Sequence, residues 1–332
     1  MRTGRQNRIL MVLLVAALLM VCLAALLFGS VMLSAGDFRD VFTGKAGYAT
    51  TIVVKLRLPR VLGAVLSGMA LSMAGLLLQT VTDNDLCSPN IIGANAGAGL
   101  GVMVTVCFFS TKAAMLEPIL AYCGTLLAVG LVLLIGRTTR SHAEGTGLIL
   151  AGIAVSAMLN AVTSMLQQLM PDAVESYTYF IAGSFRGVAL SDLVLPAVII
   201  VPACIASVCL ADPLSRLCLG DDLARNLGVP VRRVRLAAVL LSSAMTAASV
   251  TYAGMLSFVG LIVPHAARRL FGRELRTTMP GCMLLGALLT VLSDLIGRTL
   301  FAPGELSAGI FLSLLGAPFF VVLLYRRRLR HD

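Results

Sequence analysis

Five polar, uncharged side chains share one face of the apolar run 146–169. Ser156, Asn160, Thr163, Ser164 and Gln167 stand at i, i+4, i+7, i+8 and i+11, the spacing of neighbours on an α-helix. Hydroxyls and amides exchange hydrogen bonds but offer no group that titrates near neutral pH. Because such a face is costly against lipid, it must meet protein or water. It could form hydrogen bonds between helices or the wall of a pathway for a large polar solute.

A second candidate is the polar segment LGDDLARNLG at 219–228. Its leucines recur at i and i+4, and its two acidic residues suit the first turn of a helix, where the macrodipole favours negative charge. A glycine at either end would bound the helix. Such a short leucine-faced helix is typical of an element that docks into a partner's groove, or of one lying on a membrane surface. Its predicted members are Gly220, Asp221, Asp222, Leu223, Ala224, Leu227 and Gly228.

Titratable side chains are nearly absent from the apolar runs. Asp294 lies near the outer end of the ninth run, and Arg298 follows it at the i+4 spacing of a helical ion pair. Carriers driven by an ion gradient commonly use a carboxylate or histidine in mid-membrane, so the pattern argues against ion coupling. The 3 histidines are scattered and the 8 cysteines form no C-x-x-C pair. The sequence therefore predicts no metal centre.

The composition places these side chains in a membrane. Of the 332 residues, 58% are hydrophobic and 13% are charged, whereas soluble domains have about a quarter of their residues charged. This excludes a soluble enzyme, a disordered chain and a disulfide scaffold. The long apolar runs also exclude the ten-residue alternation of a β-barrel, and no G-x-x-x-x-G-K-[ST] loop is present to hold a nucleotide.

We expect an all-α, polytopic membrane protein with about ten transmembrane helices in a single domain over 1–332. Polar interruptions are expected at 34–57 and 212–232, and the first run is interpreted as an uncleaved span, with a cleaved signal peptide as the alternative. The glycine-rich stretch 93–101 is interpreted as close helix packing. The ten ranges are 9–33, 58–81, 91–110, 113–136, 146–169, 190–211, 233–252, 256–271, 279–297 and 307–325.

Basic residues predict the orientation of these spans. If both termini are cytoplasmic, most of the 26 lysines and arginines fall on the cytoplasmic side, as the positive-inside rule requires. The net charge of +10 then reflects membrane topology and indicates no nucleic-acid partner. This orientation leaves Arg57, Arg60 and Arg298 on the outside, where they need another explanation.

Several motifs together resemble a known family. They are RLPR at 57–60, the glycines 68 and 75 leading to Gln79, Asn84 and Leu86 before Ser88-Pro89, Ile92-Gly93, LAG at 150–152, Gly183-Ser184, the segment 219–229, FVGLIVPH at 258–265, Asp294 with Arg298, Glu305 to Gly309, and GAP at 316–318. In this order, over about residues 9–325, the chain resembles permeases of the iron-complex and vitamin B12 importer family of ABC transporters.

The resemblance implies a type II ABC importer permease in the bacterial cytoplasmic (inner) membrane. Such a permease forms a dimer, of identical or related subunits, with two ATPase subunits and a periplasmic or lipoprotein substrate-binding protein. The chain itself would have no catalytic site, metal or cofactor, since ATP and magnesium would bind the ATPase. The expected cargo is a chelated metal or cofactor: iron–siderophore first, then haem, then a corrinoid.

The resemblance also assigns roles to outer residues. Arg57, Arg60 and Arg298 match arginines that dock carboxylates of the binding protein, and a guanidinium suits this because it pairs with a carboxylate through two bonds. The alternatives are that Arg57 and Arg60 extend to the membrane interface and that Arg298 pairs with Asp294.

On the cytoplasmic side, Asn84 and Leu86 match the family's gate. Asp85 stands where the family usually has proline, and Cys87 where alanine is common. The segment from Gly220 to Gly228 matches the helix that couples the permease to its ATPase. For His265, a contact at a helix end or with the ATPase is expected rather than a metal ligand.

Two other function classes remain open. An ion-coupled secondary carrier working without an ATPase would transport in vesicles that contain this chain alone, driven by a proton or sodium gradient. A membrane scaffold would show no ATP-dependent uptake in any reconstitution.

Overall fold

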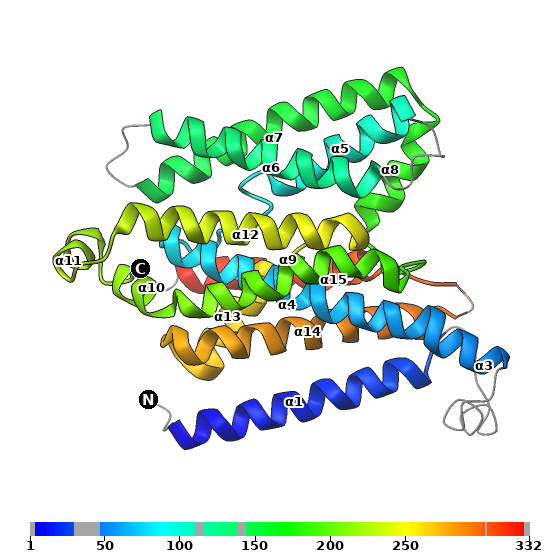
Figure 1. Ribbon diagram of the computed structural model, residues 1–332, viewed down its shortest axis with the longest axis horizontal. Coiled ribbons are helices and arrows are strands. Elements are labelled where there is room, and N and C mark those ends of the chain that lie inside the picture. Colours follow the sequence, from blue (N-terminus) through cyan, green and yellow to red (C-terminus); the bar gives the residue numbers. More distant parts are fainter. Residues whose placement is uncertain (1–3, 30–46, 110–115, 139–143, 303, 329–332) are drawn as a thin grey trace.

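The structure is a computed structural model that describes residues 4–29, 47–109, 116–138, 144–302 and 304–328. This part of the chain is helical, with no strand among the described residues, and its long helices lie lengthwise beside one another (Figure 1). The helices are α1 (Gly4–Leu27), α3 (Tyr48–Thr51), the π-helical η1 (Ile52–Arg57), α4 (Leu58–Thr82), α5 (Ala94–Phe109), α6 (Leu116–Thr138), α7 (Glu144–Leu169), α8 (Ala173–Ala182), α9 (Leu190–Cys209), α10 (Ala211–Leu217), α11 (Asp221–Asn226), α12 (Val231–Ala253), α13 (Val259–Phe271), α14 (Leu275–Leu300) and α15 (Ala308–Arg328).

Helix α4 is the core of the bundle. Most of its side chains are buried, and it packs against α14, α12, α13 and α9. Glycines permit the closest contacts, because a Cβ at Gly75 would collide with the carbonyl of Gly260 on α13. The predicted close packing of the glycine-rich stretch is confirmed in the same way, since Gly97 on α5 meets the backbone of Gly124 on α6.

The predicted membrane-spanning architecture is confirmed, although the number of spans differs. A helix lies in each of the ten predicted ranges, yet only 7 of the described helices are long and apolar enough to cross a membrane. Two further apolar helices, Ala94–Phe109 and Ala308–Val322, are shorter. The range 256–271 yields a helix of 13 residues, because Gly254 and Phe258 adopt positive φ angles and break the chain between α12 and α13.

The predicted polar interruption at 34–57 lies outside the described residues as far as residue 46, and its remaining part differs from the prediction. The chain is helical from Tyr48, and η1 runs directly into α4 to give one apolar span over Ile52–Thr82. The charges of Lys55 and Arg57 obscure the apolar character of this turn in the sequence. The helices α8 and α10 are also absent from the predicted set, since both are short and follow a longer helix closely.

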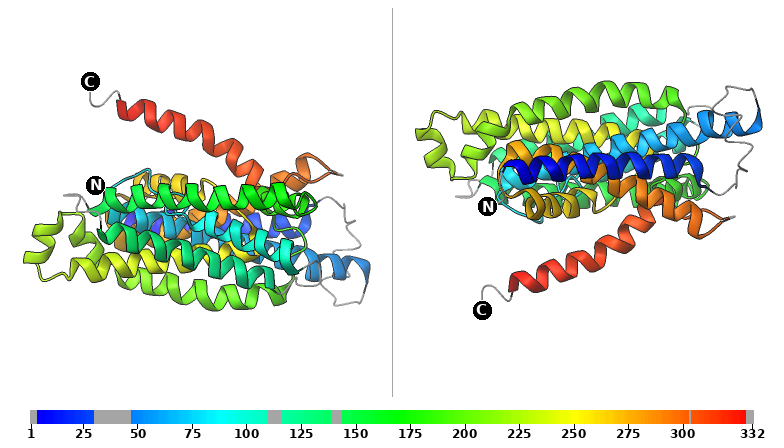
Figure 2. Two further views of the ribbon diagram at one scale, coloured as in Figure 1. Left: turned by 90° about the horizontal axis from the view of Figure 1, so that it is seen from above. Right: turned by 90° about the horizontal axis from the view of Figure 1, so that it is seen from below.

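The two ends of the bundle carry different elements. At one end lie α3 and α8, and at the other lie α10, α11 and the beginning of α1 (Figure 1). We call them the α8 end and the α11 end. Helix α15 contacts α14, α13 and α8, and Figure 2 shows it leaning away from the other helices toward its C-terminal end.

Candidate functional site

Arg57 and Arg298 bind the carbonyl groups at the end of α1. Arg57 Nη1 lies 2.8 Å from the Leu26 oxygen and 2.6 Å from the Leu27 oxygen. Arg298 Nη2 donates to the carbonyl of Ala25. The last carbonyls of a helix have no partner within the helix, and a cation beside them is favoured by the helix dipole. The two arginines therefore cap α1 from η1 and α14.

Arg60 joins α4 to α14 through a buried charge network at the α8 end. Its Nε lies 2.9 Å from both carboxylate oxygens of Asp294, and its Nη1 lies 2.9 Å from Glu305 Oε2. Arg298 Nε is 3.6 Å from Asp294 Oδ2, so the helical ion pair that the sequence proposes is present. Buried charges persist when they are paired in this way, and losing one partner leaves the other uncompensated.

The burial of these arginines bears on their predicted role in docking. Arg57, Arg60 and Arg298 are only 4%, 9% and 2% exposed, and their hydrogen bonds run to other parts of the same subunit. Docking of a binding protein at these positions stays a prediction. In this structure the guanidinium groups already hold partners within the subunit. Glu305 and the carbonyls of α1 are missing from the predicted set, because they meet the arginines only in the folded chain.

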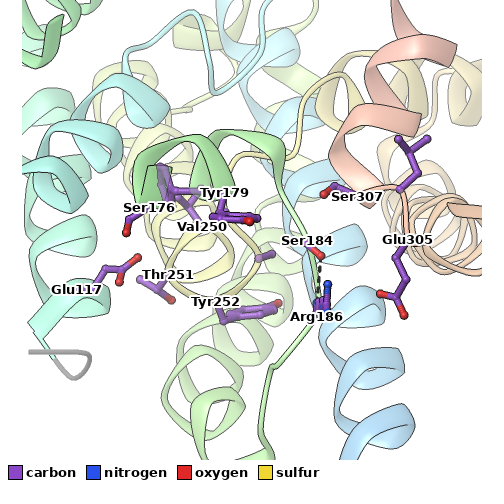
Figure 3. Close-up of a pocket in the computed structure, with 14 residues that line it drawn as sticks. Glu117, Ser176, Tyr179, Ser184, Arg186, Val250, Thr251, Tyr252, Glu305 and Ser307 are labelled. Atoms are coloured by element: carbon purple, nitrogen blue, oxygen red, sulfur yellow. Dashed lines mark hydrogen bonds between the residues drawn. The ribbon is translucent and has the colours of Figure 1, made fainter. Parts of the chain in front are cut away.

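A cavity of about 490 Å³ lies beside this network at the α8 end. Figure 3 shows Glu117, Ser176 and Thr251 on one side of it and Ser184, Arg186 and Glu305 on the other. The backbone NH of Arg186 donates to Ser184 Oγ over 3.1 Å. Because Glu305 both lines this cavity and pairs with Arg60, the buried charge network lies next to a cavity with polar side chains in its lining.

Asn84 shapes the loop that follows α4. Its Oδ1 accepts a hydrogen bond from the backbone NH of Leu86 over 3.0 Å, and its carbonyl accepts one from Cys87 over the same distance. Asp83 ends the helix with a φ of 47°. This turn chemistry fixes Leu86 and Cys87 close to the end of α4. The assignment of Asn84 and Leu86 to a gate stays a prediction.

Asp85 ties this loop to α13. Its Oδ1 lies 2.5 Å from Arg268 Nη1, and the same nitrogen lies 3.0 Å from Gln79 Oε1. Gln79 Nε2 in turn donates to the carbonyl of Gly260 over 3.3 Å. The charge that Asp85 brings to the loop, where the resembled family has proline, is thus compensated within the subunit.

Cys87 is fully buried in the loop, at 0% exposure. Its burial raises the pKa of the thiol to about 11. A thiol with so little thiolate at neutral pH is a poor nucleophile and metal ligand. Among the residues that the structure describes, no group of three or more His, Cys, Asp or Glu side chains could hold a metal ion.

The predicted short helix at 219–228 is confirmed as α11. Gly220 and Gly228 adopt φ angles of 102° and 78° on either side of it, and both acidic residues lie in its first turn. Leu223 and Leu227 are 57% and 50% exposed, whereas Ala224 is buried against the bundle. The helix therefore turns a small side chain inward and its leucines outward, as docking to a partner requires.

Asp221 faces the bundle and Asp222 faces away from it. Asp221 pairs with Arg235 of α12, whose Nη2 lies 3.1 Å from Oδ1, while Asp222 makes an exposed pair with Arg225 over 3.5 Å. The sequence pattern of 219–228 does not distinguish Asp221 from Asp222, because it does not show that Arg235 of α12 lies beside one of them.

The polar face of α7 lies across the boundary between the buried and exposed sides of the helix. Ser156 and Thr163 donate to the carbonyls of Gly152 and Leu159 within the helix, over 2.7 and 2.9 Å. Thr163 is buried, Ser156 and Gln167 are half-buried, and Asn160 and Ser164 are exposed. The predicted residues cover an arc of about 100°, so one edge meets the bundle and the other the subunit's surface. Lining of a pathway stays a prediction for this face.

His265 lies beside an aromatic ring on the neighbouring helix. Its ring and that of Phe319 on α15 have centroids 5.9 Å apart in an edge-to-face arrangement. This contact joins α13 to α15, and a contact of His265 with an ATPase stays a prediction.

Comparisons with known proteins identify the family. The model of the FecCD transport family matches residues 14–326. The chain is 39% identical over 277 residues to the Fe(3+) dicitrate transport system permease protein FecC of Escherichia coli, covering 83% of both chains. It is 34% identical over 333 residues to the hemin transport system permease protein HmuU of Yersinia pestis, covering 97% of both.

A solved structure supports the same assignment. It is an inward-facing structure of a transporter assigned to the metal-chelate ABC type, with 27% identity and a TM-score of 0.84. The match covers 96% of this chain and 99% of the solved one. The chain therefore belongs to the FecCD transport family.

Proposed function

We propose that the chain is the membrane permease of an ATP-driven ABC importer for a chelated metal or cofactor, iron–siderophore first, then haem, then a corrinoid. The observation that carries the proposal is the family match over residues 14–326, together with relatives named for Fe(3+) dicitrate and hemin transport. Hydrolysis of ATP would take place on a separate pair of ATPase subunits. The chain would sit in the bacterial inner membrane with both termini cytoplasmic.

The exposed leucines of α11 support contact with the ATPase. Leu219, Leu223 and Leu227 are 58%, 57% and 50% exposed at one end of the bundle. An apolar ridge of this size on a short helix suits a groove on a partner protein. In the proposed orientation the α11 end is cytoplasmic, where ATP is available.

The exposed edge of α7 supports a pathway shared with a second permease, identical or related. Asn160 and Ser164 are exposed among apolar residues such as Met158, Val162 and Met165. Against lipid these amide and hydroxyl groups would be costly, so a second subunit or a water-filled passage is the better neighbour. A neutral polar wall binds a bulky chelate weakly, which lets it leave again.

Reconstitution tests the proposal. The chain is co-purified with a candidate ABC ATPase subunit and placed in liposomes with a binding protein loaded with ferric dicitrate, a ferric hydroxamate or haemin. Import of one of these chelates that requires ATP and the ATPase supports the proposal. Import by the chain alone, driven by a proton or sodium gradient, would instead establish an ion-coupled carrier, and no import under either condition would leave a scaffold.

A further inference from the structure

Arg235, in the first turns of α12, bridges two elements at the α11 end. Its Nη2 lies 3.1 Å and 3.3 Å from the two carboxylate oxygens of Asp221 on α11. Its Nε lies 3.2 Å from the carbonyl oxygen of Val81, in the last turn of α4. One guanidinium thus joins α11 to α4. The loop that follows α4, residues 83–87, contains the predicted gate residues and is called the gate loop below.

The bridge fits the chemistry of both ends. The Val81 carbonyl belongs to the last turn of α4, where carbonyls lack a partner within the helix and a cation is favoured. The planar guanidinium can bind a carbonyl and a carboxylate at once, which an ammonium group cannot do in a fixed geometry. The side chains of Arg235 and Asp221 are 17% and 32% exposed, so the pair is screened less than a surface pair.

The backbone between α11 and α12 turns at a glycine. It passes through Gly228, which has a φ of 78° and no atom within 4 Å of the place where a Cβ would stand. The turn is closed by hydrogen bonds from the backbone NH groups of Gly228 and Val229 to the carbonyls of Arg225 and Ala224. Arg235 adds a connection beyond this turn, because it holds α11 directly to the end of α4.

The gate loop begins directly after the carbonyl that Arg235 binds. Asn84 and Leu86 follow Val81 within a few residues, and on its other side the loop is held by Arg268 of α13 through Asp85. The loop is therefore held from two sides, through Arg235 at the end of α4 and through Arg268 at Asp85.

We propose that Arg235 is a positioning residue that couples movement of α11 to the gate loop 83–87. The inference rests on the proposed function, since it takes α11 to be the element that an ATPase moves. When α11 shifts, Asp221 draws the guanidinium with it, and the guanidinium draws the end of α4. Loss of Arg235 uncouples the gate from ATP hydrolysis and leaves the leucine face of α11 free to bind.

The test uses the permease in its complex with the ATPase, with Cys87 as the only cysteine. Cys87 is buried within the gate loop, so its rate of reaction with a maleimide reports opening of the loop without any chelate. In the parent complex we expect a nucleotide-dependent change in this rate of at least about fivefold, the size of an ordinary coupling between sites. We expect Arg235→Gln to keep ATPase binding and hydrolysis and to lose most of this change. Asp221→Asn, which breaks the same link from the α11 side, should lose the change to the same extent. The double variant should be no worse than either single one, because both break the same link.

Arg276→Gln is the matched control. Arg276 pairs with Asp212 through two bonds of 2.6 and 2.5 Å at the same end of the molecule, and neither bond involves α4. It should leave the nucleotide-dependent change intact. The inference is overturned if chelate import or the nucleotide-dependent change in Cys87 reactivity is the same in Arg235→Gln as in the parent. It is also overturned if Cys87 in the parent complex reacts at the same rate with and without nucleotide. Either result leaves the proposed function standing. Failure of any ATPase to bind the parent overturns both.

Discussion

Arg60 and Asp294 lie 234 residues apart in the chain, yet Arg60 Nε is 2.9 Å from both carboxylate oxygens of Asp294. The pair joins the central helix α4 to α14 where both are buried. Replacing Asp294 with alanine leaves Arg298 without its carboxylate and Arg60 with Glu305 as its remaining one, so we expect a loss of about 3–5 kcal/mol in stability. Thermal unfolding in detergent measures it, with Asp212→Asn as the control because that pair is exposed. Equal midpoints for the two variants would contradict the network's structural role.

Arg57→Gln separates a capping role from a docking role. The shorter amide cannot reach both carbonyls at the end of α1, so we expect a loss of about 1–3 kcal/mol, the cost of buried acceptors without donors. Detergent unfolding and proteolysis near residues 28–29 give the readout. If the variant keeps full stability but no longer binds the loaded binding protein, docking is the main role of Arg57 and capping is secondary.

Gly75→Ala tests the contact between α4 and α13. The added Cβ meets the carbonyl of Gly260, so the helices must move apart, and we expect a loss of about 1–3 kcal/mol. The control is Gly130→Ala in α6, where no atom lies within 4 Å of the new Cβ. There alanine should be neutral or stabilise the helix by up to about 1 kcal/mol. A similar effect at both positions would show that the close approach is unimportant.

Cys87 should react with maleimides slowly at neutral pH and faster as the pH rises toward 11. Burial raises its pKa to about 11, and the thiolate is the reactive form, whereas an ordinary thiol reaches half its maximum rate near a pH of about 8.5. The labelling rate of a variant with Cys87 as its only cysteine gives the curve. Asp85→Asn, which removes the charge facing Arg268, should raise the rate at every pH. If the labelling rate stops rising near a pH of about 9, the thiol titrates like an ordinary one, and the loop is open in solution.

Leu223→Ser with Leu227→Ser should weaken ATPase binding while leaving the permease folded. Both side chains are at least half exposed, so the free subunit loses little packing, but the partner's groove loses two apolar contacts. We expect a drop in affinity of about tenfold or more, corresponding to about 1–3 kcal/mol per apolar side chain buried. Co-purification and a binding titration against the ATPase test this. Undiminished binding would place the ATPase contact elsewhere.

Features that depend on neighbours within one helix could be predicted from the sequence. The spacing of Leu223 and Leu227, the acidic first turn of α11 and the pair of Asp294 with Arg298 all follow from the period of the helix. The close approach of Gly97 to Gly124 could be predicted in kind, since small residues in apolar runs mark helix contacts, although not its partner.

Features that depend on contacts between distant segments could not be predicted from the sequence. Nothing in the local pattern of Arg57, Arg60 and Arg298 states that their side chains turn into the subunit toward α1 and Glu305. The distribution of basic residues along the chain predicted that the three arginines lie together, away from the segment 219–228. The packing of the helices determines which groups they bind. The bridge made by Arg235 was hidden for the same reason, because its partners lie 14 and 154 residues away in the chain.

The attachment of α1 has a consequence for how this part of the chain can vary. The guanidinium groups of Arg57 and Arg298 contact main-chain oxygens of residues 25–27 rather than side chains. These hydrogen bonds therefore do not depend on which apolar side chains stand at the less buried positions Leu26 and Leu27, provided that the chain stays helical there. Substitutions at these positions need no matching change in the arginines, whereas exchanging either arginine removes hydrogen bonds that hold the end of the first helix.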